Sequence, residues 1–436
     1  MAIAVLLLLG FGAASCTKRA EKPVVLTLID QGWLDKEFQQ RRSQESEEFK
    51  RQTKIEIEVL PSPESAVEQL ALWQQLLQSR SSTPDVYALD IIWPPILAQY
   101  FVDLRPYMTA EEMSAYFPAL IASNTVKDRL TALPYTASTG LLFYRTDLLR
   151  EYGFKSPPAT WDEMYTMASR IQAGERGKGI NDFWGFVWQG APSEALTCNA
   201  LEWQASEGGG DIIERDKTVS VNNPNTVRAW QRAARWVGSI SPPGVIDYRE
   251  WDAFNIWQSG KAAFMRNWSA ADVVSRSLGS AIRDKFDLTL LPAGSAGHKG
   301  VLGAITYGVS QYSLHPREAV QLVRYLCGRE NELHWARINS EPPAMPELYR
   351  EPRVIKANPH FALFKQALLK GVARPSAVTG PKYPQISQAY FEQVHSVLMG
   401  RKSAERAAAD LERELVRITG FKTPSAGSNV LPIGTK

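Results

Sequence analysis

The sequence predicts an α/β protein that contains more than one domain. Short β-rich apolar runs alternate with helical patterns near its start, and this strand–helix–strand order favours a parallel sheet with right-handed crossovers. The chain has 436 residues, which is too long for one ordinary hydrophobic core. Its 44% apolar and 22% charged residues are typical of a folded chain and exclude long disorder.

The first sheet is expected to begin with three strands separated by two helices. The strands are predicted at residues 24–29, 55–59 and 84–90, because the first is a continuous apolar run and the second alternates strictly. A charged helix ends near Gln52, and a helix with apolar spacing covers residues 67–77. Ligands bind beyond the carboxyl ends of parallel strands, so the loops after the first and third strands are expected to face a ligand.

The rest of the chain continues the alternation of strands and helices. Strands are expected at 129–135, 141–144, 261–265 and 286–292, and helices from a Thr160 N-cap, from Thr226, over 387–399 and over 403–418. The segment 422–436 is rich in Gly, Ser, Pro and Thr and is expected to be a flexible tail.

Charge and motif content exclude several classes of function. The chain has 49 Lys and Arg against 46 Asp and Glu, a net charge of +3, which argues against a nucleic-acid binder with its concentrated basic face. No glycine-rich phosphate motif follows a predicted strand. No CxxC, HExxH or paired-histidine spacing occurs among the five scattered histidines, so neither a metal nor a cofactor is expected. Cys198 and Cys327 are so far apart in sequence that their pairing stays open.

An apolar segment from Ile3 to Phe11 leads through small residues into Cys16. The segment is too short to span a bilayer as a helix and is typical of a secretory signal. The small residues before Cys16 resemble a bacterial lipobox, in which the cysteine is acylated. This pattern predicts a signal peptide over 1–15, a lipid-anchored tether over 16–22 and an exported protein on the periplasmic or extracytoplasmic face. The alternative is an ordinary signal peptide with an incidental cysteine.

A series of short motifs follows in a defined order along the chain. They are Pro84–Trp93, Tyr100–Leu104, Leu133–Tyr135 with Gly140–Leu149, Pro158–Glu163, Leu201–Trp203 with Gly208–Gly209, Gly260–Trp268, Leu302–Gly303, and Ala373–Pro375 with Tyr383–Ser387. Their shared order resembles that of family 1 extracellular solute-binding proteins of carbohydrate ABC importers, closest to the trehalose- and maltose-binding lipoproteins. The resemblance extends over nearly the whole mature chain.

The resemblance implies a two-lobed periplasmic-binding-protein fold with a hinge and an interlobe ligand cleft. Lobe 1 would contain residues 23–135 and 288–335, and lobe 2 residues 136–287 and 336–421. The implied function is the substrate-binding component of a carbohydrate ABC importer, without catalysis. Such a protein would act as a monomer, capture an α-linked disaccharide by hinge closure and deliver it to the permease transmembrane subunits. Trehalose is favoured and maltose-type sugars come next.

The resemblance also implies which side chains contact the sugar. Asp90 would accept hydrogen bonds from hydroxyl groups, Trp268 would cover a pyranose face, and the planar fork of Arg374 would bond two adjacent hydroxyls. The other candidates are Gln31, Trp33, Glu37, Ser138, Glu202, Asn267 and Gly303.

Several alternatives stay open at this point. Glu202 could pair with a core arginine instead of a sugar, and Ser138 stands where the family often has Asp. Ile305 stands where the trehalose/maltose branch often has a second Trp, a role that Trp93 or Tyr307 could take. A secreted glycoside hydrolase is the alternative function, and it would need two carboxylates such as Asp90 and Glu202 on either side of a glycosidic bond. A surface adhesion protein is a third possibility.

Overall fold

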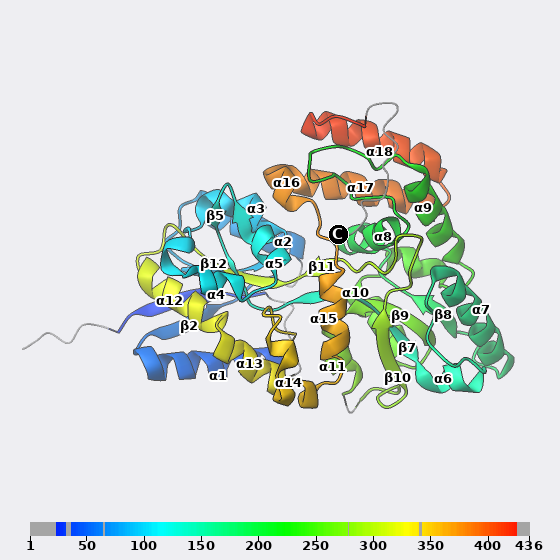
Figure 1. The fold of residues 1–436 in the computed structure, drawn as a ribbon, viewed down its shortest axis with the longest axis horizontal. Helices are drawn as coiled ribbons and strands as arrows, with labels where there is room; N and C mark the ends of the chain where they lie inside the picture. The colour runs from blue at the N-terminus through cyan, green and yellow to red at the C-terminus, as the bar shows by residue number, and fades with distance from the viewer. Residues whose placement is uncertain (1–22, 32–35, 64–65, 278, 340–341, 425–436) are drawn as a thin grey trace, which may run out of the picture.

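The structure is a computed structural model that describes residues 23–31, 36–63, 66–277, 279–339 and 342–424 (Figure 1). It contains two α/β lobes, each built around its own five-stranded sheet. The two-lobed α/β fold that the sequence predicted is therefore confirmed. Predicted features that lie outside the described residues are the signal segment, Cys16, Trp33 and most of the tail, and the side chain of Glu37 is not described either.

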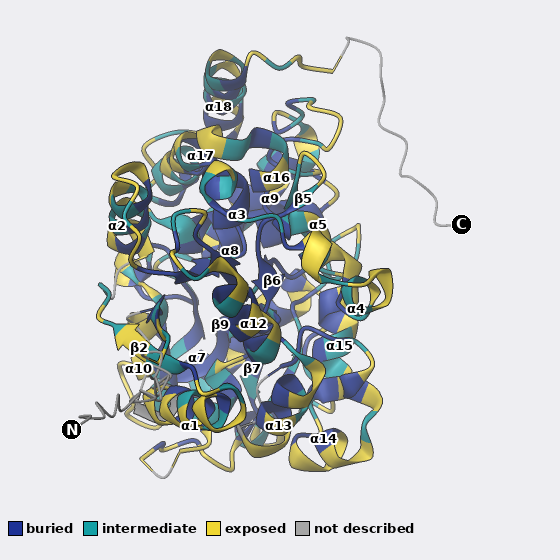
Figure 2. Cartoon of the chain, turned by 90° about the vertical axis from the view of Figure 1, so that its left-hand side faces the viewer, coloured by how far each residue is buried: buried dark blue, intermediate teal, exposed yellow. Residues whose placement is uncertain are grey.

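The first lobe contains a mixed sheet with the strand order β2-β1-β3-β12-β6. Its strands are β1 (Val25–Ile29), β2 (Glu56–Leu60), β3 (Val86–Asp90), β12 (Ile305–Val309) and β6 (Leu133–Pro134). The crossover helices α1 (Lys36–Thr53) and α2 (Ala66–Gln78) keep β1, β2 and β3 parallel, as the sequence pattern indicated. Strands β3 and β12 are buried almost throughout and β1 for most of its length, whereas the edge strand β2 is partly exposed (Figure 2), which explains why β1 and β3 are apolar and β2 alternates.

The second lobe contains a sheet with the order β10-β7-β9-β8, to which β11 adds by pairing with β7. Its strands are β7 (Ser138–Arg145), β8 (Trp184–Val187), β9 (Ala262–Trp268), β10 (Phe286–Leu290) and β11 (Leu302–Gly303). Residues of one parity, such as Leu142 and Phe264, pack on one side of the sheet, and their neighbours Phe143 and Met265 pack on the other. This alternation lets helices cover both faces.

The helices around the second sheet belong to separate parts of the chain. They are α6 (Thr146–Glu151), α7 (Trp161–Gly177), α8 (Glu194–Ser206), α9 (Pro224–Trp236), α10 (Glu250–Gln258), α11 (Ala271–Ser275), α15 (Phe361–Leu369), α17 (Tyr383–Leu398) and α18 (Ala404–Thr419). The Thr160 side chain caps α7, as predicted, by accepting from the Glu163 N–H at 3.2 Å.

The remaining helices lie mostly with the first lobe. They are α3 (Trp93–Leu97), α4 (Ala110–Ser114), α5 (Pro118–Asn124), α12 (Pro316–Leu326), α13 (Arg329–Asn339), α14 (Pro352–Ala357) and α16 (Ser376–Thr379). Because α15 packs on β7 and β10 whereas α16 packs on α3 and α5, the C-terminal part of the chain passes repeatedly between the lobes.

One predicted strand and one predicted lobe boundary differ from the structure. The segment 129–135 is not one strand, because the Thr131 N–H and hydroxyl both bond to the Asn124 carbonyl and separate β5 (Arg129–Leu130), which pairs with β4 (Thr125–Val126), from β6. Strand β10 pairs with β7 in the second sheet, where Phe286 packs on Phe143. The return to lobe 1 therefore does not begin at residue 288, as the sequence-based division had it, but between β11 and β12.

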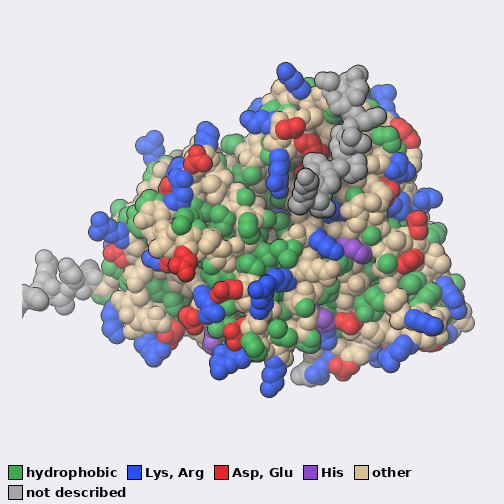
Figure 3. All heavy atoms as spheres, in the orientation of Figure 1, with side chains coloured by type: hydrophobic (Ala, Val, Ile, Leu, Met, Phe, Trp, Pro, Cys, Tyr) green, Lys and Arg blue, Asp and Glu red, His purple; other side chains and the backbone are tan. Residues whose placement is uncertain are grey.

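Cys198 and Cys327 are both buried and unpaired, one in each lobe. In the ranges that the structure describes, no helix combines the length and the apolar character that a membrane crossing needs. On the face drawn in Figure 3, basic and acidic side chains of the described residues are interspersed, as the near-neutral net charge suggested.

Candidate ligand site

Arg374 lies between the two lobes and holds one carboxylate from each. Its Nη2 donates to Asp90 Oδ1 at 3.1 Å, and its Nη1 donates to Glu194 Oε1 at 2.9 Å. Asp90 ends β3 of the first lobe, whereas Glu194 begins α8 of the second. The arginine is only 6% exposed, but the side chains of Asp90 and Glu194 are 34% and 30% exposed. The guanidinium thus links the lobes while both carboxylates still reach solvent.

The position of Asp90 follows from the strand that precedes it. Strand β3 is buried up to Leu89, and Asp90 is its first residue with solvent access. Asp90 Oδ1 also accepts from the Ile92 N–H at 3.1 Å, which fixes the carboxylate orientation. Its Oδ2 has no hydrogen-bond partner among the described residues. A carboxylate oxygen in this state can accept a hydrogen bond from a ligand hydroxyl.

Glu194 is a site residue that the sequence interpretation missed. Besides Arg374, it accepts from the Tyr383 hydroxyl at 2.5 Å and from Ser387 Oγ at 2.6 Å, both on α17. Tyr383 and Ser387 bound one of the motifs noted in the sequence, but Glu194 lies outside all of them. Only the spatial contact of α8 with α17 identifies it.

Trp268 lies at the end of β9, beside a second group of predicted residues. Its neighbour across the sheet is Gly140, and the Arg266 guanidinium lies 4.3 Å from its ring centre. A Cβ atom added at Gly303 would be 3.2 Å from the Trp268 ring and 3.5 Å from the Ser138 Cβ, so these three residues adjoin one another. The ring is partly exposed, and a side chain at 303 would crowd it.

Backbone contacts connect the Trp268 group to Arg374 and Asp90. The Leu302 carbonyl, next to Gly303, accepts from Arg374 Nη2 at 3.5 Å. Two residues further on, Ile305 is paired with Asp90 in the first sheet. The structure therefore brings five predicted residues together, namely Asp90, Ser138, Trp268, Gly303 and Arg374.

Glu202 does not lie in this group, and its predicted ligand contact is corrected. It is fully buried and forms a bidentate ion pair with Arg266, with Nε–Oε2 at 2.9 Å and Nη2–Oε1 at 2.5 Å. It also accepts from the Val301 N–H at 3.1 Å. The alternative pairing with a core arginine is therefore what the structure shows, and Glu202 supports Trp268 through Arg266. The carboxylate pair that a hydrolase would need is absent at Asp90 and Glu202.

Asn267 and Gln31 are also largely buried. Asn267 is 4% exposed, and its Oδ1 accepts from the Trp268 N–H at 2.8 Å, so it shapes the strand end and does not face solvent. Gln31 follows β1, the strand next to β3, and is 5% exposed. Its neighbour Asp30 accepts from Arg42 Nε at 2.8 Å and from the Tyr307 hydroxyl at 3.1 Å.

Neither Trp93 nor Tyr307, the two possible substitutes for a second aromatic residue at the site, is exposed. Trp93 is 3% exposed and packs edge-on against Trp73, and Tyr307 is fully buried. Trp268 is therefore the one predicted indole among the described residues that adjoins the Asp90–Arg374 contact.

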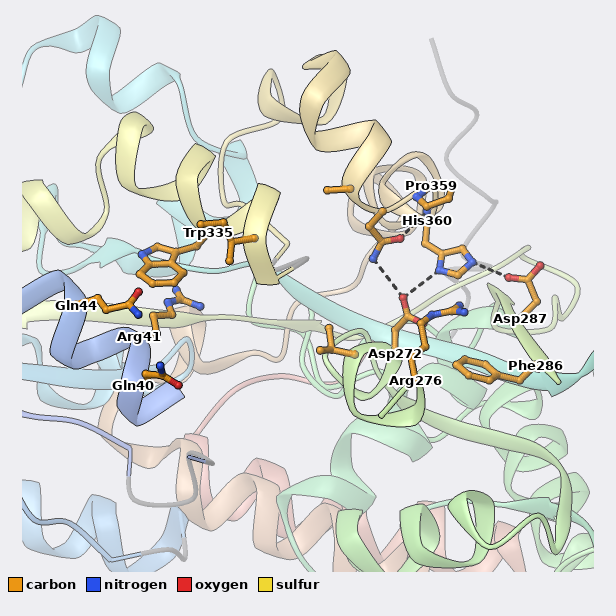
Figure 4. Close-up of a pocket in the computed structure, with 14 residues that line it drawn as sticks. Gln40, Arg41, Gln44, Asp272, Arg276, Phe286, Asp287, Trp335, Pro359 and His360 are labelled. Carbon is orange, nitrogen blue, oxygen red and sulfur yellow. Dashed lines mark hydrogen bonds and ion pairs between the residues drawn. The ribbon is translucent and has the colours of Figure 1, made fainter. Parts of the chain in front are cut away.

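A charged cluster involves Asp272 in the short helix α11, which follows Trp268 and β9 in the chain. His360 Nδ1 is 3.0 Å from Asp272 Oδ2, and its Nε2 is 2.6 Å from Asp287 Oδ1 (Figure 4). Burial alone would lower the pKa of His360, but the hydrogen bonds with Asp272 and Asp287 outweigh it and raise the pKa to about 9. The imidazole is therefore a cation at neutral pH, and it holds the segment before α15 against the second lobe.

Comparison with known proteins identifies the family. The family model for bacterial extracellular solute-binding proteins matches residues 29–332. The chain belongs to this family. It is 42% identical over 365 residues to a probable ABC transporter-binding protein of Deinococcus radiodurans, covering 84% of this chain and 87% of the relative. Its family and relatives are solute-binding proteins, so this solute-binding protein is not an enzyme.

Solved structures agree with this assignment. The structure is similar to maltose-bound MalE3 of T. maritima, with a TM-score of 0.83, 31% identity and coverage of 91% of this chain and 100% of that one. It is also similar to the acarbose-binding GacH receptor of Streptomyces glaucescens, with a TM-score of 0.80 at 23% identity, covering 92% and 100% of the two chains. The second similarity concerns the fold alone.

Proposed function

We propose that this solute-binding protein captures an α-linked disaccharide between its lobes and delivers it to the permease subunits of a sugar ABC transporter. Trehalose is the first candidate and maltose-type sugars come next. The observation that carries the proposal is Arg374, which holds the partly exposed carboxylates of Asp90 and Glu194, one from each lobe, beside Trp268. The similarity to maltose-bound MalE3 at 31% identity supports the same ligand class.

The chemistry of this group suits an uncharged polyhydroxyl ligand. Asp90 Oδ2 is available to accept a hydroxyl hydrogen, and the partly exposed indole of Trp268 can cover the C–H face of a sugar ring. The Nη groups of Arg374 already donate to Asp90, Glu194 and the Leu302 carbonyl. The main contribution of Arg374 is therefore to orient these acceptors. A sugar that touches both lobes stabilises the closed form through contacts that the open form lacks.

Isothermal titration calorimetry with trehalose, maltose and sucrose tests this proposal. We expect saturable binding of an α-glucoside, a rise in melting temperature with ligand concentration, and no sugar cleavage. Trp268→Ala should weaken the binding, whereas Trp251→Ala, at an exposed tryptophan of α10, should not. Absence of binding to all three sugars would refute the disaccharide assignment.

We also propose that the protein is exported and anchored through an acylated Cys16, acting as a monomer. The proposal rests on the apolar segment and the small residues before Cys16. Metabolic labelling with a fatty acid should mark the wild-type protein but not Cys16→Ser. Equal labelling of the two proteins would contradict the anchor.

A further inference from the structure

His360 lies where the chain passes from α14 of the first lobe to α15 on the second. Helix α14 packs on α13, whereas α15, which begins directly after His360, packs on β7 and β10. The imidazole lies between two carboxylates, with Nδ1 at 3.0 Å from Asp272 Oδ2 and Nε2 at 2.6 Å from Asp287 Oδ1 (Figure 4). Both carboxylates belong to the second lobe, so the imidazole fixes the N-terminal end of α15 to that lobe.

Asn358 attaches the same segment a second time. Its Nδ2 donates to Asp272 Oδ2 at 3.2 Å, and its Oδ1 accepts from the His360 N–H at 2.8 Å. Arg276 Nε also donates to Asp272, at 2.8 Å. Asp272 is only 2% exposed, so its charge depends on these three donors. Loss of the imidazole would therefore weaken a buried set of contacts that holds the start of α15.

Helix α15 connects this cluster to the proposed ligand site. It has nine residues, or about 14 Å, and the chain leads from its end to Arg374. On the way, the Val372 N–H donates to the Gly300 carbonyl and its own carbonyl accepts from the Leu302 N–H, both at 2.9 Å. The Leu302 carbonyl also accepts from Arg374 Nη2 at 3.5 Å. A displacement of α15 would consequently reach Arg374, although His360 lies at the opposite end of the helix.

The contact of His360 with both carboxylates depends on its positive charge. Burial would lower the pKa of His360, but the hydrogen bonds with Asp272 and Asp287 raise it to about 9. A neutral imidazole carries a hydrogen on one nitrogen only, so it could donate to only one of the two carboxylates. Other charged or titratable groups on the neighbouring elements are Arg276 at the end of α11, Tyr144 of β7, Tyr349 and Arg350 before α14, Arg353 and Lys356 of α14, Lys365 of α15 and, across the cavity in Figure 4, Arg41 of α1.

We propose that His360 is a positioning residue for sugar binding that acts through α15. Its bonds to Asp272 and Asp287 hold this helix on the second lobe, and the helix holds Arg374 where its guanidinium joins the two lobes. This inference rests on the proposed sugar-binding function and adds a determinant of affinity that does not touch the sugar. The protonated form of His360 is the form that binds sugar tightly.

Calorimetry between pH 7 and pH 10 tests the inference in wild type and His360→Gln, with whichever of trehalose, maltose and sucrose binds the wild type. The matched control is His315→Gln, at a partly exposed histidine that precedes α12 in the first lobe. Circular dichroism and melting temperature establish that each variant folds. At pH 7 we expect the Kd of His360→Gln to be about three- to tenfold higher than that of the wild type.

The pH profile distinguishes a charged positioning residue from a merely structural one. The wild-type Kd should rise as the pH passes through 9, so its advantage over His360→Gln should disappear by pH 10. Groups that titrate in both proteins cancel in this comparison, and His315→Gln should follow the wild type throughout. Asp287→Asn removes one of the two carboxylates that raise the pKa of His360, so the rise in Kd should begin at lower pH. This second variant keeps the test decisive if His360→Gln does not fold.

Equal Kd values for wild type and His360→Gln at pH 7 would overturn the inference and leave the sugar site intact. Parallel pH profiles of these two proteins would also overturn it, as would a profile of Asp287→Asn that coincides with that of the wild type. Absence of binding of every sugar to the wild type would refute the proposed function itself, and the inference with it.

Discussion

Replacing Arg374 by alanine removes the cation that links the two lobes. In the wild type its guanidinium donates to Asp90 at 3.1 Å and to Glu194 at 2.9 Å. Burial opposes its charge, but the nearby negative groups hold the pKa of Arg374 well above its ordinary value. The variant would leave two carboxylates from different lobes facing each other without the cation, so we expect losses in both stability and ligand affinity.

The magnitude follows from how far each partner is buried. Removing one partner of a fully buried ion pair costs about 3–5 kcal/mol. Asp90 and Glu194 keep 34% and 30% of their side-chain surface exposed, so water can solvate them in the variant. We therefore expect the free energy of unfolding to fall by about 2–3 kcal/mol, at or below the lower end of that range. Loss of the orientation of Asp90 should weaken one charge-assisted hydrogen bond to the sugar, or about 1.5–3 kcal/mol.

Urea denaturation measures the first effect and calorimetry with trehalose or maltose measures the second, where the expected change in Kd is about ten- to a hundredfold. Arg374→Lys keeps the charge but not the planar fork, so it should give intermediate values. Arg353→Ala, at an exposed arginine of α14, is the matched control. Unchanged unfolding free energy and Kd in Arg374→Ala would show that this residue neither links the lobes nor orients Asp90.

Three further substitutions test neighbouring parts of the structure. Trp268→Ala should raise the Kd for the sugar about five- to thirtyfold, the equivalent of about 1–2 kcal/mol, and an unchanged Kd by calorimetry would remove the indole from the site. The raised pKa of His360, about 9, means that its protonated form stabilises the fold fully below about pH 6.5 and that this contribution disappears as the pH rises through 9. His360→Gln should therefore lower the unfolding free energy by at most about 3 kcal/mol at pH 6 and by much less at pH 10, and a pH-independent difference in urea denaturation would contradict the charged state. Gly140→Ala would place a Cβ atom 2.0 Å from Glu202 Oε1, so its melting temperature should fall clearly, and a wild-type value would mean that the buried ion pair can move aside.

Local patterns were sufficient to predict most strands and the position of Asp90. The first three strands were predicted within one or two residues, because burial leaves apolar runs in β1 and β3 and the partly exposed edge strand β2 keeps a regular alternation. The Asp90 position follows from the same principle, since a polar residue that ends a buried parallel strand lies at the ligand edge of the sheet. These features depend on residues close together in sequence.

Pairing between distant residues could not be predicted in the same way. Glu202 and Glu194 both lie on α8, yet one is fully buried against Arg266 and the other holds Arg374 and Tyr383. Nothing in the local sequence distinguishes them, because their partners are 64 or more residues away. The position of β10 is a similar case, since its alternating pattern fits either sheet and only its pairing with β7 decides.

The chain segments that pass between the lobes are also those that carry the proposed ligand groups. The chain first passes between the lobes from β6 to β7, and Ser138 is the first residue of β7. It passes back from β11 to β12, where Gly303 and Ile305 lie on either side of the connection. It passes again between α15 and α16, and Arg374 lies in that segment. Any hinge motion must change backbone angles in these passages, so it must also move Ser138, Gly303 and Trp268 of the second sheet relative to Asp90 of the first. Under the proposed function, ligand contact and lobe closure would therefore be coupled through the same residues, without a separate signalling path. A substitution in these passages should consequently change sugar affinity even where its side chain does not touch the sugar.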